Sequence, residues 1–470
     1  MDIQERIDSY FNDSAVRGEL ISAISRLVAV KSVKGEPTAE APFGPGPRAA
    51  LDEAVKLCAE LGFSVRDYDH YVGLADMNDK DTQLHILAHL DVVGEGSGWS
   101  TDPYTCVEKD GVLYGRGVSD DKGPLCAALF AMKAVRDLGL PVTKNARLIM
   151  GTDEESGSGD IKYYYAREPY APQSFSPDAD FPLINVEKGQ FRPVFGASWP
   201  AVMVEPRVSV LSGGFRFNVV PPEASAEVLG LRAADITPLC PTVERMSGAM
   251  FTVTDMVGGA RIHCTGKNAH AASPDDGVNA IQAMLELLSA LPLAQCQSTR
   301  AIRALKERFP LGDTRGKALG IAQKDDSGEL TVNLALMTLS ETGFSAQFDA
   351  RVPVCATVEN CVQVCEKALG EAGFTLTGGA QMVPAHVVAA DTPLVKTLLE
   401  CYSAYTGVRD PKPMAIGGGT YVHDIPGGVA FGCDFPGFDP KMHSANEQAS
   451  VDNLIKSAKI FALAIARLCR

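Results

Sequence analysis

Histidine and acidic residues gather where short apolar runs of this chain end. The run LHILA leads into His89 and Asp91, and the run RLIMG leads into Glu154 and Glu155. Imidazole nitrogens and carboxylate oxygens bind metal ions and also transfer protons. The sequence therefore predicts metal-assisted or acid-base chemistry at the ends of these runs.

His89 and Asp91 are two residues apart at the end of a predicted strand. Because strand side chains alternate, we expect the Asp91 carboxylate to hold one ring nitrogen of His89, which leaves the other nitrogen for a metal ion. A surface histidine beside an unrelated acid is the alternative. His85 lies four residues earlier, about 13 Å along an extended strand, and we interpret it as structural.

The segment GRGVSDDKGP places two glycines and two adjacent carboxylates, Asp120 and Asp121, before a predicted helix. A glycine-rich turn before a helix can instead bind a dinucleotide. Here, however, acids replace the third glycine of that fingerprint and would repel a pyrophosphate. We therefore rank a nicotinamide-linked oxidoreductase below a metal site.

Glu154 and Glu155 point in different directions, which suits one cation-binding carboxylate and one that handles a proton. A solvated acidic loop that caps the following helix is the alternative. Asp178 lies in SPDADFP, and His443 lies in a late loop after the run VAFG. Two histidines and three carboxylates would suit Zn²⁺, Mn²⁺ or Co²⁺. With one bridging ligand they suffice for two ions, which can activate a water and polarise a carbonyl.

The elements that must position these residues alternate between strands and helices, which predicts an α/β fold. We expect helices over about 2–30 and 47–62, a helix after Pro124, and a last amphipathic helix over 451–468. In open sheets of this kind, ligands collect at the carboxyl ends of the strands. The chemically unusual residues follow the predicted strands, in agreement with that rule.

The pattern changes between about 190 and 382. Strand-like runs such as RIHCTG, LTVNLALMTL and FSAQFDARV flank the helical stretches NAIQAMLELLSAL and VENCVQVCEKALGEAG, and acid-rich loops become rare. We predict a catalytic domain over 1–189 and 383–470, interrupted by an inserted α+β lid domain over 190–382.

Composition limits the partners. The 470 residues include 43 Lys and Arg against 58 Asp and Glu, for a net charge of −15. Nucleic acid and membrane surfaces are therefore not expected partners. The 12 scattered cysteines are typical of buried thiols in a reducing compartment. The charged N-terminus lacks the apolar core of a signal peptide, so we expect a cytoplasmic protein.

Seven motifs occur in an order that resembles a known family: HLDVV, GRGVSDDKGP, TDEESGSGD, SPDADFP, GKNAHAASPDDGVNA, GGGTY and MHSANE. Over about residues 10–465 the chain resembles co-catalytic metallopeptidases related to aminoacylase and succinyl-diaminopimelate desuccinylase, above all the PepV-type dipeptidases. The resemblance implies a zinc-exopeptidase-like α/β domain with a mixed sheet flanked by helices. It also implies two divalent metal ions per chain, Zn²⁺ or Mn²⁺, with Co²⁺ as a further option.

The resemblance also implies roles for individual residues. One ion would be held by His89, Asp120 and Asp178, and the other by Asp120, Glu155 and His443, with Asp120 bridging. Asp121 would be a neighbour and not a ligand. Asp91 would orient His89, and Glu154 would be the general base that deprotonates the bridging water.

In the inserted segment, the resemblance assigns oxyanion stabilisation to His270 and capture of a C-terminal carboxylate to Asn218 and Arg351. The glycines of GGGTY, including Gly418 and Gly419, would bring backbone N–H groups to that carboxylate. From the residues alone, Arg351 could instead form a strand salt bridge and Asn218 could be a turn residue.

One position departs from the PepV-type pattern. After Tyr421 the chain reads Val-His423-Asp424, where that pattern continues Ala-Arg, so the side-chain preference stays open. No motif gives a role to the remaining histidines, which we interpret as structural or surface residues: His70, His263, His386 and His423.

We therefore expect a monomeric metal-dependent dipeptidase that cleaves dipeptides or short peptides with a free C-terminal carboxylate. The enlarged inserted segment resembles the lid with which PepV-type enzymes work as monomers. An N-acyl-amino-acid deacylase or desuccinylase is the alternative within the same chemistry. A non-catalytic binding protein on the same fold is a further alternative, although every matched position is present.

Overall fold

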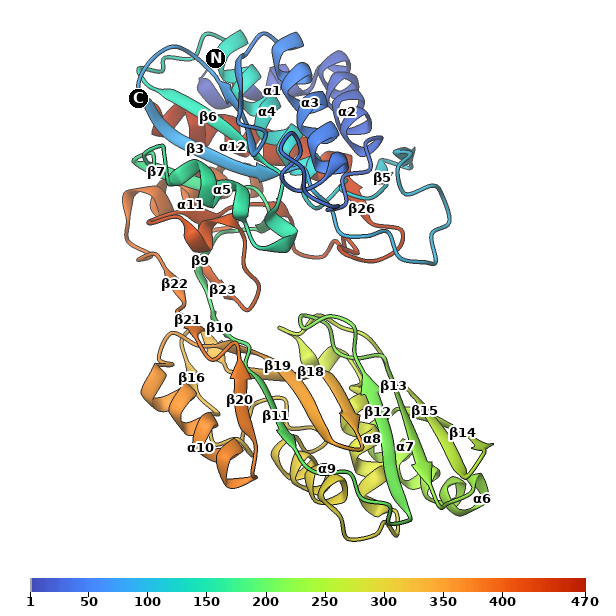
Figure 1. Ribbon diagram of the computed structural model, residues 1–470. Helices are drawn as coiled ribbons and strands as arrows, with labels where there is room; N and C mark the ends of the chain where they lie inside the picture. Colours follow the sequence, from blue (N-terminus) through green and yellow to red (C-terminus); the bar gives the residue numbers. More distant parts are fainter. Residues whose placement is uncertain (1) are drawn as a thin grey trace. The chain divides into compact units, whose positions relative to one another are not determined.

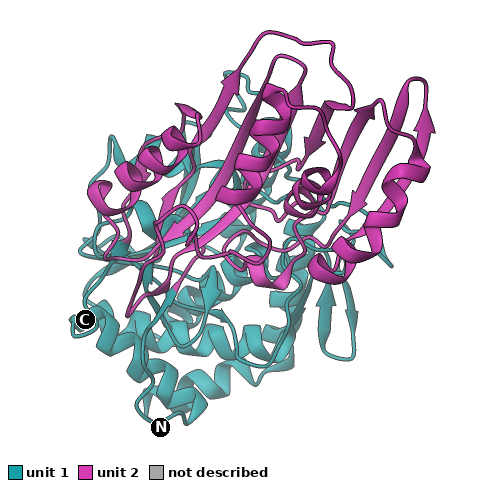
Figure 2. Cartoon of the chain, turned by 90° about the horizontal axis from the view of Figure 1, so that it is seen from below, with its two compact units in different colours: residues 1–187, 386–415, 419–470 teal, residues 188–385, 416–418 magenta. Residues whose placement is uncertain are grey.

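The computed structural model describes residues 2–470, which divide into two compact units (Figure 2). Unit 1 comprises the chain up to Glu187, His386–Ala415 and Gly419–Arg470, and unit 2 comprises Lys188–Ala385 and Ile416–Gly418. The units are defined by packing alone. The predicted assignment of a catalytic domain and a lid concerns their roles and stays a prediction.

Unit 1 combines a mixed sheet with helices (Figure 1). Its helices are α1 (Ile3–Phe11), α2 (Ser14–Val28), α3 (Pro45–Glu60), α4 (Lys122–Asp137), α5 (Gly159–Tyr165), α11 (Pro393–Thr406) and α12 (Val451–Leu468), with short 3-10 turns η1 (Glu154–Ser156) and η5 (Tyr421–Asp424). Its strands are β1 (Ser64–Tyr68), β2 (Val72–Asp76), β3 (Thr82–His89), β4 (Val107–Lys109), β5 (Val112–Tyr114), β6 (Asn145–Gly151), β7 (Gln173–Ser176), β8 (Ala179–Asp180), β9 (Ile184–Glu187), β22 (His386–Val387), β23 (Met414–Ile416), β24 (Val429–Ala430), β25 (Cys433–Asp434) and β26 (Gln448–Ser450).

The single helix predicted over about 2–30 is wrong, because this stretch forms α1 and α2. Asn12 ends α1, and Asp13 begins α2 by accepting a hydrogen bond from the backbone N–H of Ala15 at 2.8 Å. An aspartate at this position satisfies a helix-terminal N–H group, so it favours a new helix start over continuation. The predicted last helix coincides with α12.

The strand order of the main sheet is β1–β2–β6–β3–β7–β24–β9–β22, with β23 beside β9. The central strands β6, β3, β7 and β24 run parallel to their neighbours in this series, whereas β2 and β9 pair antiparallel with β6 and β24. The carboxyl ends of the parallel strands therefore meet at one edge. The predicted mixed α/β sheet is confirmed.

Both faces of this sheet are covered. Ile86 and Ala88 of β3 face the larger core with α4 and α12, while Leu87 between them faces a smaller cluster with Tyr164 and Tyr421. Alternate strand residues point to opposite faces, so a strand covered on both sides is apolar at successive positions. That is why residues 86–88 of this strand, Ile-Leu-Ala, are apolar at successive positions.

Unit 2 is an α+β unit. Its strands are β10 (Gly189–Phe191), β11 (Val194–Ser198), β12 (Arg207–Gly213), β13 (Glu223–Leu229), β14 (Met250–Met256), β15 (Gly259–Thr265), β16 (Lys324–Asp325), β17 (Gly328–Glu329), β18 (Thr331–Ser340), β19 (Gly343–Val352), β20 (Thr375–Gly378) and β21 (Met382–Val383). Its helices are α6 (Ala233–Ile236), α7 (Cys240–Ser247), α8 (Ala280–Ala290), α9 (Gln297–Arg308) and α10 (Gln363–Glu371), with short turns η2 (Thr237–Leu239), η3 (Pro274–Asp276) and the π-helical η4 (Val358–Val362).

The main sheet of unit 2 has the order β14–β15–β13–β12–β18–β19–β10–β21, and β11 pairs with both β19 and β20. Alternate residues of β13, Ala224, Ala226 and Val228, are buried and share a core with Ile281 and Met284 of α8. One face of the strand thus packs on helices while the intervening side chains are partly exposed.

No helix within residues 2–470 is both long and apolar enough to span a bilayer.

Candidate metal centre and substrate-binding residues

The carboxyl-terminal edge of the parallel strands in unit 1 collects the predicted ligands. His89 is the last residue of β3, Glu154 and Glu155 form η1 just after β6, and Asp178 follows β7. Asp120 precedes α4, and His443 comes from the loop before β26. The structure brings these side chains together, and their roles stay predictions.

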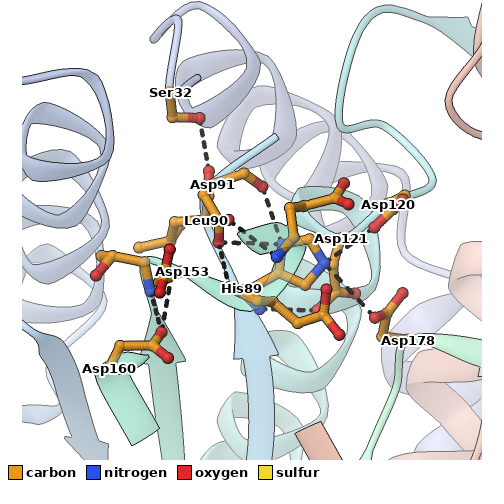
Figure 3. Close-up of polar contacts among 12 residues, drawn as sticks. Ser32, His89, Leu90, Asp91, Asp120, Asp121, Asp153, Asp160 and Asp178 are labelled. Carbon is orange, nitrogen blue, oxygen red and sulfur yellow. Dashed lines mark hydrogen bonds and ion pairs between the residues drawn. The ribbon is translucent and has the colours of Figure 1, made fainter. Parts of the chain in front are cut away.

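Asp120 lies between two histidines. Its Oδ1 is 2.9 Å from Nε2 of His89 (Figure 3). Its Oδ2 is 2.8 Å from Nε2 of His443. Nε2 of His89 is also 3.5 Å from Oδ2 of Asp178, and Nε2 of His443 is 3.1 Å from Oε1 of Glu155. One carboxylate therefore offers one oxygen to each side, as a bridging ligand would.

Two groups of three residues have ligand atoms within 4.8 Å of one another: His89, Glu154 and Asp178, and Asp120, Glu155 and His443. The second group coincides with a set implied by the family resemblance. The first contains Glu154, to which the resemblance gives the role of base. Its carboxylate therefore lies within 4.8 Å of the ligand atoms of His89 and Asp178, and its role as a base stays a prediction.

The Asp91 carboxylate does not make the close contact with the His89 ring that the strand pattern predicts. Nδ1 of His89 is 2.9 Å from the backbone carbonyl oxygen of Asp91 and 3.5 Å from its carboxylate. The carboxylate instead accepts the N–H groups of Glu154 and Glu155, both at 3.1 Å. An Nδ1–H that donates to the carbonyl leaves the Nε2 lone pair for a metal ion.

Acidic side chains outnumber histidine side chains around this site. Asp121 is fully buried; its Oδ2 accepts the N–H of His89 at 2.9 Å, and its Oδ1 has no hydrogen-bond partner. Burial raises the pKa of the Glu154 and Asp178 carboxyls above their usual range. Buried carboxylates need compensating positive charge. This donor set of imidazole and carboxylate therefore fits divalent cations.

Glu447, which the sequence analysis did not single out, organises the loop that carries Asp120. It is fully buried, pairs with Nη1 of Arg116 at 2.7 Å, and accepts the N–H groups of Gly117, Ser119 and Asp120 at 3.0, 3.0 and 3.1 Å. Its place in MHSANE, four residues after His443, is the only signal in the sequence that could have found it.

In unit 2, the structure brings Asn218 and His270 together through their backbones. The carbonyl of Asn218 accepts the N–H of Ala271 at 2.9 Å, and Val219 forms an isolated β-bridge with His270. Their predicted roles at the substrate stay predictions.

Arg351 is held by its own strand. Its Nε and Nη2 donate to the two carboxylate oxygens of Asp349 at 2.8 and 3.1 Å, and its Nη1 donates to the carbonyl of Gly417 at 2.7 Å. The salt bridge considered as an alternative therefore exists, and the binding of a substrate carboxylate by Arg351 stays a prediction. Gly418 follows in the same unit, whereas Gly419 is assigned to unit 1.

The other histidines have local partners. Nδ1 of His85 lies 2.9 Å from the hydroxyl of Tyr165. The remaining ones lie near a carboxylate, a hydroxyl or a carbonyl: His70 near Asp67, His263 near Ser225, His386 near the carbonyl of Gly428, and His423 near Glu187.

Two solved structures share the fold. Human carnosine dipeptidase 1 aligns with a TM-score of 0.60 at 16% identity, over 100% of this chain and 99% of that chain. Aminopeptidase PepT from Bacillus cereus aligns with a TM-score of 0.55 at 17% identity, over 97% of this chain and 99% of that chain. At these identities the likeness concerns the fold, and it agrees with the predicted fold class.

Sequence comparison is more specific. The Bacillus subtilis protein named "Putative dipeptidase YtjP" is 34% identical over 458 residues, which cover 96% of this chain and 97% of that protein. Residues 85–467 match peptidase family M20/M25/M40, and this span contains all the candidate metal ligands. The predicted family resemblance is thereby confirmed: the chain belongs to the M20/M25/M40 peptidase family.

Proposed function

We propose that this protein is a metal-dependent dipeptidase that hydrolyses dipeptides or short peptides with a free C-terminal carboxylate. The observation that carries the proposal is the Asp120 carboxylate, which offers one oxygen to His89 and the other to His443. A relative named as a dipeptidase matches nearly the whole chain and supports the choice of substrate.

The residues present fit two ions. His89, Asp120 and Asp178 would hold one, and Asp120, Glu155 and His443 would hold the other. When bound, a pair of Zn²⁺ or Mn²⁺ ions supplies Lewis acidity, which polarises the scissile carbonyl and makes water a better nucleophile.

Glu154 would handle the proton. Burial raises the pKa of its carboxyl above the usual range, so this carboxylate accepts a proton more readily than a glutamate in water does. Its carboxylate would take a proton from the attacking water and pass it to the leaving amine nitrogen. Asp91 would keep Glu154 in place, since it accepts the N–H of that residue.

The residues of the inserted segment would bind the substrate. His270 would donate a hydrogen bond to the developing oxyanion, and Asn218 and Arg351 would bind the C-terminal carboxylate together with N–H groups at Gly418 and Gly419. A guanidinium fork matches the geometry of a carboxylate, and one well-placed oxyanion donor is worth about 3 kcal/mol.

The test is a substrate panel. We expect the purified full chain, loaded with Mn²⁺ or Zn²⁺, to hydrolyse L-dipeptides and to leave N-acetyl and N-succinyl amino acids intact. Exclusive turnover of the acylated substrates would assign the protein to the deacylases instead. Metal analysis of the same preparation identifies the ion that supports the activity.

We also propose that the protein works as a cytoplasmic monomer. The free thiols of its 12 cysteines suit a reducing compartment. Light scattering coupled to size exclusion tests the oligomeric state, and a dimer mass would contradict the proposal.

A further inference from the structure

A single buried carboxylate in unit 2 is shared by two arginines. Asp349 is fully buried; it receives Nε and Nη2 of Arg351 at 2.8 and 3.1 Å, and Nε of Arg192 at 3.2 Å. Arg351 lies on β19, and Arg192 directly follows β10, the strand that pairs with β19. Two guanidinium groups therefore meet at one acid.

Arg192 makes fewer hydrogen bonds than Arg351 and is more exposed to solvent. Its Nε donates to Asp349, and its guanidinium carbon lies 4.5 Å from the centre of the Phe217 ring. Its side chain is 28% exposed, and that of Arg351 is 3% exposed. The hydrogen bond to Asp349 uses Nε, and the two Nη groups of Arg192 donate to no residue among 2–470. Each Nη group therefore carries donors that a ligand could use.

The same place also contains Asn218, which the family resemblance links to substrate binding. Asn218 follows Phe217, whose ring covers Arg192. Asn333, the β18 partner of Asp349 in strand register, donates from Nδ2 to the carbonyl of Val219 at 2.9 Å. The loop with Asn218 is therefore fixed to the strand pair that carries Asp349.

The charges around Asp349 do not balance. Two guanidinium groups and one carboxylate leave one positive charge in a largely buried position. Burial lowers the pKa of Arg192, and the positive charge of Arg351 acts in the same direction. An arginine nevertheless stays protonated in proteins, so the remaining charge favours an anion.

We propose that Arg192 is a specificity-determining residue that binds the C-terminal carboxylate of the peptide together with Arg351, with Asp349 holding both guanidinium groups in position. This inference rests on the proposed dipeptidase function and adds a residue that none of the motifs contains. One net positive charge matches one carboxylate, and the Phe217 ring orients the guanidinium plane of Arg192.

The binding test uses the metal-loaded full chain and a dipeptide analogue that cannot be hydrolysed. In this Ala-Leu analogue a methylene group replaces the peptide carbonyl, and it is prepared as the free acid and as the C-terminal amide. Isothermal titration calorimetry compares wild type, Arg192→Met and Arg192→Lys. Arg261→Met is the matched control, because Arg261 lies on β15 of the same sheet, is 60% exposed and pairs with Glu227 at 2.7 Å.

We expect Arg192→Met to weaken binding of the free acid by about ten- to a hundredfold and to leave binding of the amide unchanged, since a charge-assisted hydrogen bond contributes on that scale. Arg192→Lys keeps the charge without the planar fork, so it should lose several-fold on the acid only. The control should bind both ligands like wild type. Melting curves establish that the variants are folded.

Three results would overturn the inference: an unchanged affinity of Arg192→Met for the acid, an equal loss for acid and amide, or no binding of the acid by wild type. If Arg192→Met does not fold, the acid-to-amide ratio of Arg192→Lys decides. Hydrolysis of Ala-Leu by wild type tests the proposed function separately. A wild type that binds the acid through Arg192 without hydrolysing any dipeptide would contradict the dipeptidase alone.

Discussion

Replacing Glu447 should destabilise unit 1 strongly, although Glu447 is not a candidate ligand. Its Oε2 pairs with Arg116, and its Oε1 accepts three backbone N–H groups of the loop that ends at Asp120. Arg116 is 1% exposed, and its Nε already lacks a hydrogen-bond partner. In Glu447→Ala, a buried cation and three buried donors would therefore lose their acceptor.

The expected size follows from these contacts. Removing one partner of a buried ion pair costs about 3–5 kcal/mol, and a buried donor left unsatisfied costs about 1–3 kcal/mol. Because such costs are not additive and water can enter, we expect a loss of at least about 4 kcal/mol for Glu447→Ala. Glu447→Gln keeps one acceptor oxygen and should lose about 3 kcal/mol. Arg116→Met combined with Glu447→Gln should recover part of that loss, since no unpaired charge remains.

Urea unfolding followed by far-ultraviolet circular dichroism measures these changes in protein treated with EDTA, so that metal binding does not contribute. A loss below about 1 kcal/mol for Glu447→Ala would refute the reasoning, because ordinary surface substitutions have effects of that size. A double variant less stable than Glu447→Gln alone would show that the ion pair is not the dominant contribution.

Three further predictions concern the site and its support. Glu154→Gln should lower turnover by about a hundredfold or more with metal content near wild type, whereas Asp120→Asn should lose both, as elemental analysis and a dipeptide assay will show. EDTA should lower the melting temperature and abolish turnover, and Zn²⁺ or Mn²⁺ should restore both in a thermal-shift titration. Burial lowers the pKa of His85 from 6.5 to about 4. As the pH falls from 6.5 to 4, the His85 imidazole therefore takes up a proton in the unfolded chain but stays neutral in the folded chain. This difference should reduce the unfolding free energy by up to about 3 kcal/mol. Urea titrations at several pH values should show that His85→Phe removes this part of the pH dependence.

Each of these has a clear contrary outcome. Equal metal loss in the Glu154 and Asp120 variants would contradict their different roles, and a melting temperature insensitive to EDTA would argue against the metal centre. An identical pH dependence of stability in wild type and His85→Phe would show that this imidazole does not titrate as stated.

The meeting of the candidate ligands was predictable, because parallel strands align their carboxyl ends and the ligands follow those strands. His89 and Asp178 illustrate this, since His89 ends β3, Asp178 follows β7, and these two strands are neighbours. The contact of Asp91 was less predictable. Side-chain alternation holds only within a strand, and β3 ends at His89, so the Asp91 carboxylate is free to turn toward η1.

Glu447 and Asp349 escaped the sequence analysis for a different reason. Glu447 acts on residues more than 320 positions earlier, and Asp349 acts on Arg192, which is 157 positions away. The motif MHSANE contains Glu447 but does not reveal its distant partners, and Asp349 in its strand belongs to no motif. Only the fold shows that these carboxylates are buried and that both oxygens of each accept hydrogen bonds.

The position of β24 has a consequence for how the protein is made. This strand, Val429–Ala430, lies between β7 and β9, although both of those end before residue 188. A nascent chain on the ribosome thus holds an open gap in its sheet until some 240 further residues have emerged. Synthesis stopped before that point leaves an unfilled slot beside β7, exposed to chaperones and proteases, and without His443.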